Sequence, residues 1–196
     1  MTIRLSILAA LIFCATLFAQ AQVDSTSMAA RKVKYFNAFS AGGLTGKSGQ
    51  GTGATLSMIH GIRMNRLAIG GGVAFDGYRN WNVVPVFGSA YYDVVRIKSN
   101  ALFVQLNVGY SFANRITDTE QMFNNYNEYG SQMINSMVGY RIKAKQYSLY
   151  MQVGHKYQVV HYKFDPMPSW SSFWMPAVSV EENLNRFVVA IGLGLN

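Results

Sequence analysis

Apolar and polar side chains alternate over residues 101–112, and this stretch carries the clearest pattern in the chain. Every second residue is apolar, and the set ends in aromatics: Leu102, Val104, Leu106, Val108, Tyr110 and Phe112. The intervening residues are mostly polar or small: Phe103, Gln105, Asn107, Gly109 and Ser111. A period of two predicts a β-strand whose two faces meet different environments. The length suits a transmembrane strand, which needs about 9–11 residues.

Similar alternation recurs in seven further stretches, and together these predict eight strands. The other strands are expected at about 33–42, 51–63, 67–77, 83–96, 131–142, 147–162 and 184–195. In the first of them the faces stay open, because Tyr35 and Phe39 compete with Phe36 and Ala38. The connections alternate in length. Tight turns fall around Asn65, Ser99 and Ala144, and the two long loops are 113–130 and 164–182.

This organisation predicts an all-β fold, an eight-stranded antiparallel up-and-down transmembrane β-barrel. Such a barrel has short turns at one end and longer loops at the other, and its closure leaves no sheet edge in lipid. An even strand count places both termini at the tight-turn end. A soluble lipocalin-like ligand carrier has the same strand count with its apolar set inward, and it is one alternative. Long strands and tyrosines near strand ends favour the membrane.

The first residues have the features of a secretory signal peptide, which we assign to residues 1–22. Arg4 is followed by an apolar run, and Ala19-Gln20-Ala21 is a small-x-small site at which we expect cleavage, near Ala21. Residues 23–196 are then the barrel domain. The single cysteine, Cys14, lies in the leader. The mature chain is therefore expected to have no disulfide and no thiolate metal site.

The charges are sorted along the chain by the kind of connection they adjoin. Lysine and arginine number 17 against 9 acidic residues. Basic residues at or beside the tight turns are Arg63, Arg66, Arg96, Lys98, Arg141, Lys143 and Lys145. Acidic residues in the long loops are Asp118, Glu120, Glu128, Asp165, Glu181 and Glu182. Because the bases do not gather on one face, nucleic acid is not an expected partner.

In this architecture the chain resembles the small outer-membrane β-barrels of Gram-negative bacteria, of the OmpA transmembrane-domain or OmpX kind, and outer-membrane barrels of Bacteroidota. The resemblance covers residues 33–196. It implies an outer-membrane location, contact with outer-membrane lipid and lipopolysaccharide, and passage through periplasmic chaperones to the barrel-assembly machinery. Such barrels usually end in an aromatic residue that the machinery reads, whereas here Asn196 follows Leu195.

The face assignment directs five charged residues inward: Asp76, Asp93, Arg141, Lys156 and Arg186. They could form a proton or ion path, or they could fill the lumen as a network of paired charges. We favour the network, because eight strands leave an interior just wide enough for side chains and buried charges need partners. We expect no cofactor and no metal site.

The second long loop is unusually rich in large apolar residues: Trp170, Phe173, Trp174 and Met175. Aromatic anchors in a loop are typical of a binding surface, here for an extracellular protein or glycan. The alternative is that the loop covers the barrel mouth or enters the headgroup layer.

Catalysis is the remaining alternative, because small outer-membrane barrels include lipid A acyltransferases and deacylases that use His with Ser and an acid. The histidines are His60, His155 and His161. Ser57 and His60 lie on opposite faces of one strand and cannot meet directly. We therefore assign no catalytic residues and expect a surface-exposed interaction or envelope-structural role through the two long loops. A lipid-modifying enzyme with its site near His155 and His161 is the alternative.

Overall fold

The computed structural model describes residues 33–46, 51–116, 124–144, 146–165 and 178–195, and this part of the chain forms ten strands. They are β1 (Val33–Thr45), β2 (Gly53–Met64), β3 (Leu67–Gly77), β4 (Trp81–Ile97), β5 (Asn100–Arg115), β6 (Asn124–Tyr129), β7 (Ser131–Ala144), β8 (Tyr147–Asp165), β9 (Val178–Asn183) and β10 (Arg186–Leu195). None of the described residues belongs to a helix long and apolar enough to cross a bilayer.

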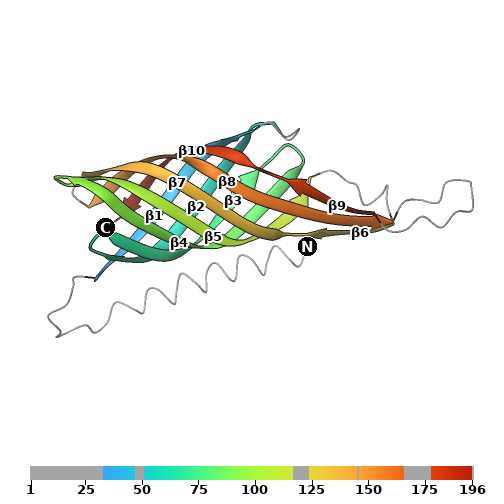
Figure 1. Ribbon diagram of the computed structural model, residues 1–196, viewed down its shortest axis with the longest axis horizontal. Helices are drawn as coiled ribbons and strands as arrows, with labels where there is room; N and C mark the ends of the chain where they lie inside the picture. The colour runs from blue at the N-terminus through green and yellow to red at the C-terminus, as the bar shows by residue number, and fades with distance from the viewer. Residues whose placement is uncertain (1–32, 47–50, 117–123, 145, 166–177, 196) are drawn as a thin grey trace, which may run out of the picture. The chain divides into compact units, whose positions relative to one another are not determined.

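Eight of these strands close into a barrel (Figure 1). Neighbours pair in the order β10-β1-β2-β3-β4-β5-β7-β8, and β8 pairs with β10 to complete the ring. All of these pairings are antiparallel. The predicted eight-stranded antiparallel up-and-down β-barrel is confirmed. Closure gives each barrel strand two neighbours, so that no edge of the ring is left unpaired.

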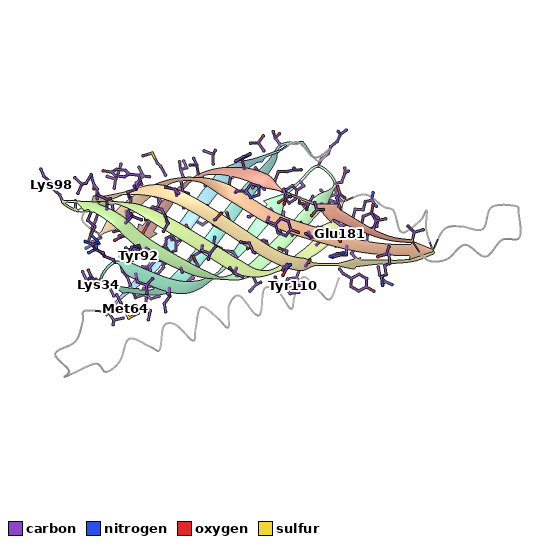
Figure 2. The ribbon with its side chains drawn as sticks, viewed as in Figure 1. Lys34, Met64, Tyr92, Lys98, Tyr110 and Glu181 are labelled. Carbon is purple, nitrogen blue, oxygen red and sulfur yellow. The ribbon has the colours of Figure 1, made fainter. Side chains whose placement is uncertain are left out.

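The outer surface of the barrel is apolar and the interior is filled. On β5, Leu106 is 47% exposed and the adjacent Gln105 is 3% exposed. The outward set from Leu102 to Phe112 extends about 33 Å along the strand. At a tilt of about 40° this spans about 25 Å, the height of a lipid-facing apolar band. Tyr92 and Tyr110, both exposed, lie toward opposite ends of that band (Figure 2).

This assignment of faces contradicts the soluble lipocalin-like alternative, in which the apolar set would point inward. It also resolves the faces of β1. Phe36 and Ala38 are buried in the interior, whereas Tyr35 and Phe39 are exposed on the outside.

Tight turns join the strands at one end of the barrel, which we call the turn end. β2 and β3 are joined through Asn65-Arg66, and β4 and β5 through Lys98-Ser99. Asn65 and Lys98 both have φ of 56°, the left-handed conformation that lets so short a turn reverse the chain. The first barrel residue and the last are at this end too, since Val33 pairs with Met64 and Leu195 with Tyr147.

At the opposite end, three strands continue past the barrel as a small sheet (Figure 1). β8 is 19 residues long. Beyond Gln158, where its pairing with β7 ends, it pairs with β6 on one side and β9 on the other. We call this sheet, formed by β6, residues 159–165 of β8 and β9, the blade, and this end of the barrel the blade end. The expectation that 113–130 and 164–182 are loops throughout is therefore wrong for β6 and β9. Their sequences do not show the long outward apolar set that lipid imposes on barrel strands, because their order depends on pairing with β8.

Two glycines allow β2 and β3 to lie close together in the wall. Gly61 pairs with Gly70 across these strands. A Cβ on Gly61 would lie 2.1 Å from the carbonyl oxygen of Ile69, and one on Gly70 would lie 2.2 Å from that of His60. A methyl group at either position would collide with backbone, so the local curvature requires glycine.

Candidate functional site

The interior holds two clusters of buried charge, one near each end. At the blade end, β3 and β8 bring Asp76 and Lys156 together, 0% and 2% exposed. The Nζ atom of Lys156 donates to both carboxylate oxygens at 2.8 Å. Thr55 on β2 donates its hydroxyl to the same carboxylate at 2.6 Å. Asp76 is thus neutralised by a single cation and held by an additional hydrogen bond.

Polar residues extend the blade-end cluster around Tyr78, which lies between β3 and β4. Its hydroxyl donates to Gln158 at 2.7 Å, and Gln158 donates to Ser111 at 2.6 Å. Burial, followed by the charge of Asp76, raises the pKa of Tyr78, while Arg186 acts in the opposite direction. The phenol therefore remains a neutral hydrogen-bond donor across the ordinary pH range.

Arg186 on β10 is the least satisfied charged side chain of this cluster. It is 1% exposed and lies directly across from Lys156 in the strand register. Its Nη1 donates to the carbonyl oxygen of Asn185 at 3.1 Å, and its guanidinium carbon lies 5.6 Å from the ring centroid of Tyr78. Nε and Nη2 have no hydrogen-bond partner among the described residues. The carboxylate of Asp76 is occupied by Lys156, and Arg186 forms no ion pair with any carboxylate of the described residues.

At the turn end, one buried acid is surrounded by three arginines. Asp93 on β4 is 0% exposed. Its carboxylate lies 2.9 Å from Arg141, 2.9 Å from Arg96 and 3.3 Å from Arg63. Of these three bases, only Arg141 was predicted from the sequence to point inward. The period of two along β2 would have found Arg63, because it shares the parity of the inward Thr55 and Ile59.

Arg96 could not have been found in that way. Between Asp93 and Val95 the pairing of β4 with β5 shifts by one residue. Strict alternation would place Arg96 on the face opposite Asp93, whereas the bulge allows its Nε to donate to Asp93 at 3.0 Å. The interior therefore carries five bases against the two acids rather than three.

A layer of aromatic side chains separates the two charge clusters. Phe36 meets Tyr91, Tyr91 meets Phe103, and Phe103 meets Tyr150, with ring centroids 5.6, 5.7 and 5.9 Å apart. All four side chains are buried. A cavity beside Tyr91 and Tyr150 has a volume of about 10 Å³, enough for about one water molecule. The aromatic contacts thus link β1, β4, β5 and β8 across the interior.

A second set of contacts joins the blade to the barrel strands at the blade end. Trp81 at the start of β4 is 1% exposed and donates its indole N–H to Glu182 of β9 at 3.0 Å. The guanidinium of Arg115 lies 5.7 Å from the Trp81 ring centroid and 5.3 Å from that of Tyr162 on β8. The backbone N–H of Arg115 donates to Glu128 of β6. The blade is therefore anchored to the barrel by Glu128 and Glu182 and by cation–π contacts.

The remaining candidate residues do not form a second site in the described part of the chain. Trp170, Phe173, Trp174 and Met175 lie outside the described residues. Ser57 forms a hydrogen bond with Ser40 at 2.6 Å, and His60 stacks on Tyr35.

The other two histidines are apart from this pair. His155 packs its ring against Phe187 on the outer surface. His161 pairs with Tyr129 and Glu181 in the blade. Among the described residues there is no group of three His, Cys, Asp or Glu that could hold a metal ion.

Comparison with known proteins supports the architecture. No protein-family model matches the sequence, and no curated protein is significantly similar to it. The crystal structure of Neisserial surface protein A aligns with 11% identity and a TM-score of 0.58, covering 83% of this chain and 97% of that one. The outer membrane protein OprG from Pseudomonas aeruginosa aligns with 11% identity and a TM-score of 0.59, covering 82% and 94%. The chain thus has the fold of the small eight-stranded outer-membrane β-barrels.

Proposed function

We propose that this protein is an integral outer-membrane β-barrel that neither conducts nor catalyses and that acts through its exposed end, as an interaction or envelope-structural protein. The observation that carries the proposal is the combination of an apolar exterior with a filled, charged interior. Such an exterior is stable only where lipid surrounds it, because water would meet exposed apolar side chains on every strand of the barrel. Shared fold with two outer-membrane proteins supports the location.

The interior argues against a pore. Ions entering from either end would meet buried, paired charges and then the aromatic layer of Phe36, Tyr91, Phe103 and Tyr150. Eight strands enclose roughly the volume that their own side chains occupy. The charges therefore stabilise the barrel and do not define a conduction path.

The purified protein in a planar bilayer is expected to show at most small, rare openings. A double substitution of Tyr91 and Phe103 by alanine removes the centre of the aromatic layer and is expected to raise the frequency or size of the openings. Single-channel recording of both proteins tests this. Steady, large conductance from the monomeric wild-type protein would contradict the filled interior.

The blade is the element we assign to partner binding. Its outward face presents Tyr129, Lys163 and Glu181, all exposed. In the described residues, the outer edges of β6 and β9 have no strand beside them, and an unpaired edge can accept an extended segment of another chain. We propose an extracellular protein or glycan as the partner, with Trp170, Phe173, Trp174 and Met175 as proposed anchors.

Cysteine labelling of intact cells tests the location and the orientation together. The mature chain has no cysteine of its own, since Cys14 is the only one in the sequence. With a membrane-impermeant maleimide, Glu181→Cys and Arg79→Cys are expected to label on intact cells, and Ser99→Cys only after lysis. Labelling of Ser99→Cys on intact cells, with Glu181→Cys protected, would reverse the orientation. Recovery of the protein in the soluble fraction would remove the membrane assignment.

Lipid modification remains the alternative of a different class, although the described residues bring no serine and histidine into a reactive pair. Analysis of lipid A from a deletion strain separates the two functions. An unchanged acylation pattern is expected, and a pattern restored by the wild-type gene but not by a His155→Ala or His161→Ala variant would establish the enzyme instead.

A further inference from the structure

The turn end carries a ring of exposed cations that the interior network does not use. Among the described residues, four exposed basic side chains at this end lie outside the network around Asp93: Lys34, Arg66, Lys98 and Lys143. They come from the start of β1, the β2–β3 turn, the β4–β5 turn and the end of β7. They are therefore distributed around the barrel, and Lys34 and Lys98 mark this end in Figure 2.

Within the described residues the ring has no acidic counterpart. Among the described residues, Asp93 is the only acid at the turn end, and it is fully buried and already bound by three arginines. In that part of the chain none of the four exposed cations forms an ion pair with a carboxylate. The opposite end differs, because Glu128, Glu181 and Glu182 lie there among the bases.

The ring lies at a definite depth relative to the apolar band. Lys34 lies level with Val33 and Tyr35, which are 54% and 45% exposed, but by the alternation of the strand it shares the face of the inward Phe36. Lys98 follows Ile97, 57% exposed, and Arg66 precedes Leu67, 39% exposed. Along the barrel axis the cations thus lie level with the end of the lipid-facing surface, at the depth of the headgroup layer.

We propose that this ring binds the phosphate groups of anionic phospholipids in the membrane leaflet at the turn end, an inference that rests on the proposed membrane location. Its distribution around the circumference matches a bilayer that surrounds the barrel. An acidic polymer such as peptidoglycan, by contrast, would contact the turn end from one side. Each basic residue near an anionic surface strengthens binding by about fivefold.

Spin-labelled lipids measure the selectivity directly. The full mature chain is folded into phosphatidylcholine vesicles that contain spin-labelled phosphatidylglycerol or phosphatidylcholine, and the association constants of the two lipids are compared by electron paramagnetic resonance. For the wild-type protein we expect at least about a twofold preference for phosphatidylglycerol, which high salt reduces. The quadruple variant Lys34→Gln/Arg66→Gln/Lys98→Gln/Lys143→Gln is expected to bind both lipids equally.

Matched controls separate the ring from net charge and from folding. Arg79→Gln/Lys163→Gln removes exposed cations from the blade end and is expected to keep the preference. The double variant Lys98→Gln/Lys143→Gln is expected to lose part of the preference for phosphatidylglycerol. It replaces the quadruple variant if that variant folds poorly.

Three results would overturn the proposal: no preference in the wild-type protein, the same preference after neutralisation of the ring, or loss of the preference in the blade-end control. A ring variant that loses binding to purified peptidoglycan while keeping its lipid preference would assign the ring to the acidic polymer instead. Failure of the wild-type chain to enter any vesicle, including pure phosphatidylcholine, would contradict the membrane location itself, and insertion without selectivity would contradict the ring alone.

Discussion

Replacement of Asp93 by asparagine is expected to lower the free energy of unfolding by about 3–5 kcal/mol, the cost of leaving a buried ion without its partner. Asp93 is the one carboxylate bound to Arg63, Arg96 and Arg141. The side chains of Arg63 and Arg141 are 12% and 9% exposed, so water cannot compensate for the lost charge. Asparagine keeps the shape and removes only the charge, and the three guanidinium groups would then repel one another at close range.

Urea titration of the protein folded in lipid vesicles, followed by the gel mobility of unheated samples, measures this effect. Arg96→Gln is the matched control. That side chain is 34% exposed, and a partly solvated pair contributes about 1 kcal/mol or less. Adding Arg141→Gln to Asp93→Asn is expected to recover part of the loss by removing one of the unpaired cations. If Asp93→Asn were no more harmful than Arg96→Gln, the carboxylate would not be the centre of the cluster.

Leu106→Arg is expected to destabilise the protein in a bilayer by about 2–4 kcal/mol, the cost of a cation on the lipid face at the midplane. Leu106 is 47% exposed and lies at the middle of the outward set of β5. In water such an exposed position would accept arginine with little change. The penalty therefore arises from lipid, and its size shows whether Leu106 faces hydrocarbon.

Ile116→Arg is the matched control, since Ile116 is 52% exposed and directly follows β5 at the blade end, beyond the apolar band. The same substitution there is expected to cost about 0–1 kcal/mol. Unfolding of both variants in vesicles gives the difference. Equal costs at the two positions would mean that Leu106 does not face hydrocarbon.

The alternation of side chains was enough to predict the barrel, because lipid constrains one face of every strand, residue by residue. Phe75 and Asp76 show this on β3, where one is 46% exposed and the next is 0% exposed. The same reasoning directed Asp76, Asp93, Arg141, Lys156 and Arg186 inward from the sequence. It failed on β1, where aromatic residues occupy both faces and only the packing of Phe36 on Tyr91 decides between them.

Three features depended on the tertiary structure. The bulge after Asp93 turns Arg96 toward that carboxylate, and a one-residue shift of pairing leaves no trace in a period of two. The strands β6 and β9 are ordered by pairing with β8, and so the pattern of their own residues does not predict them.

The pairing of charges is the third. Apart from β1 and Arg96, the sequence by itself determined which side chains are withdrawn from lipid, since contact with lipid acts on each residue separately. Only the closed barrel decided that Asp76 binds Lys156 and that Asp93 binds three arginines, because those contacts join strands up to 80 residues apart. A side chain's environment is a local property of the pattern, whereas its partner is set by the register and closure of the whole sheet.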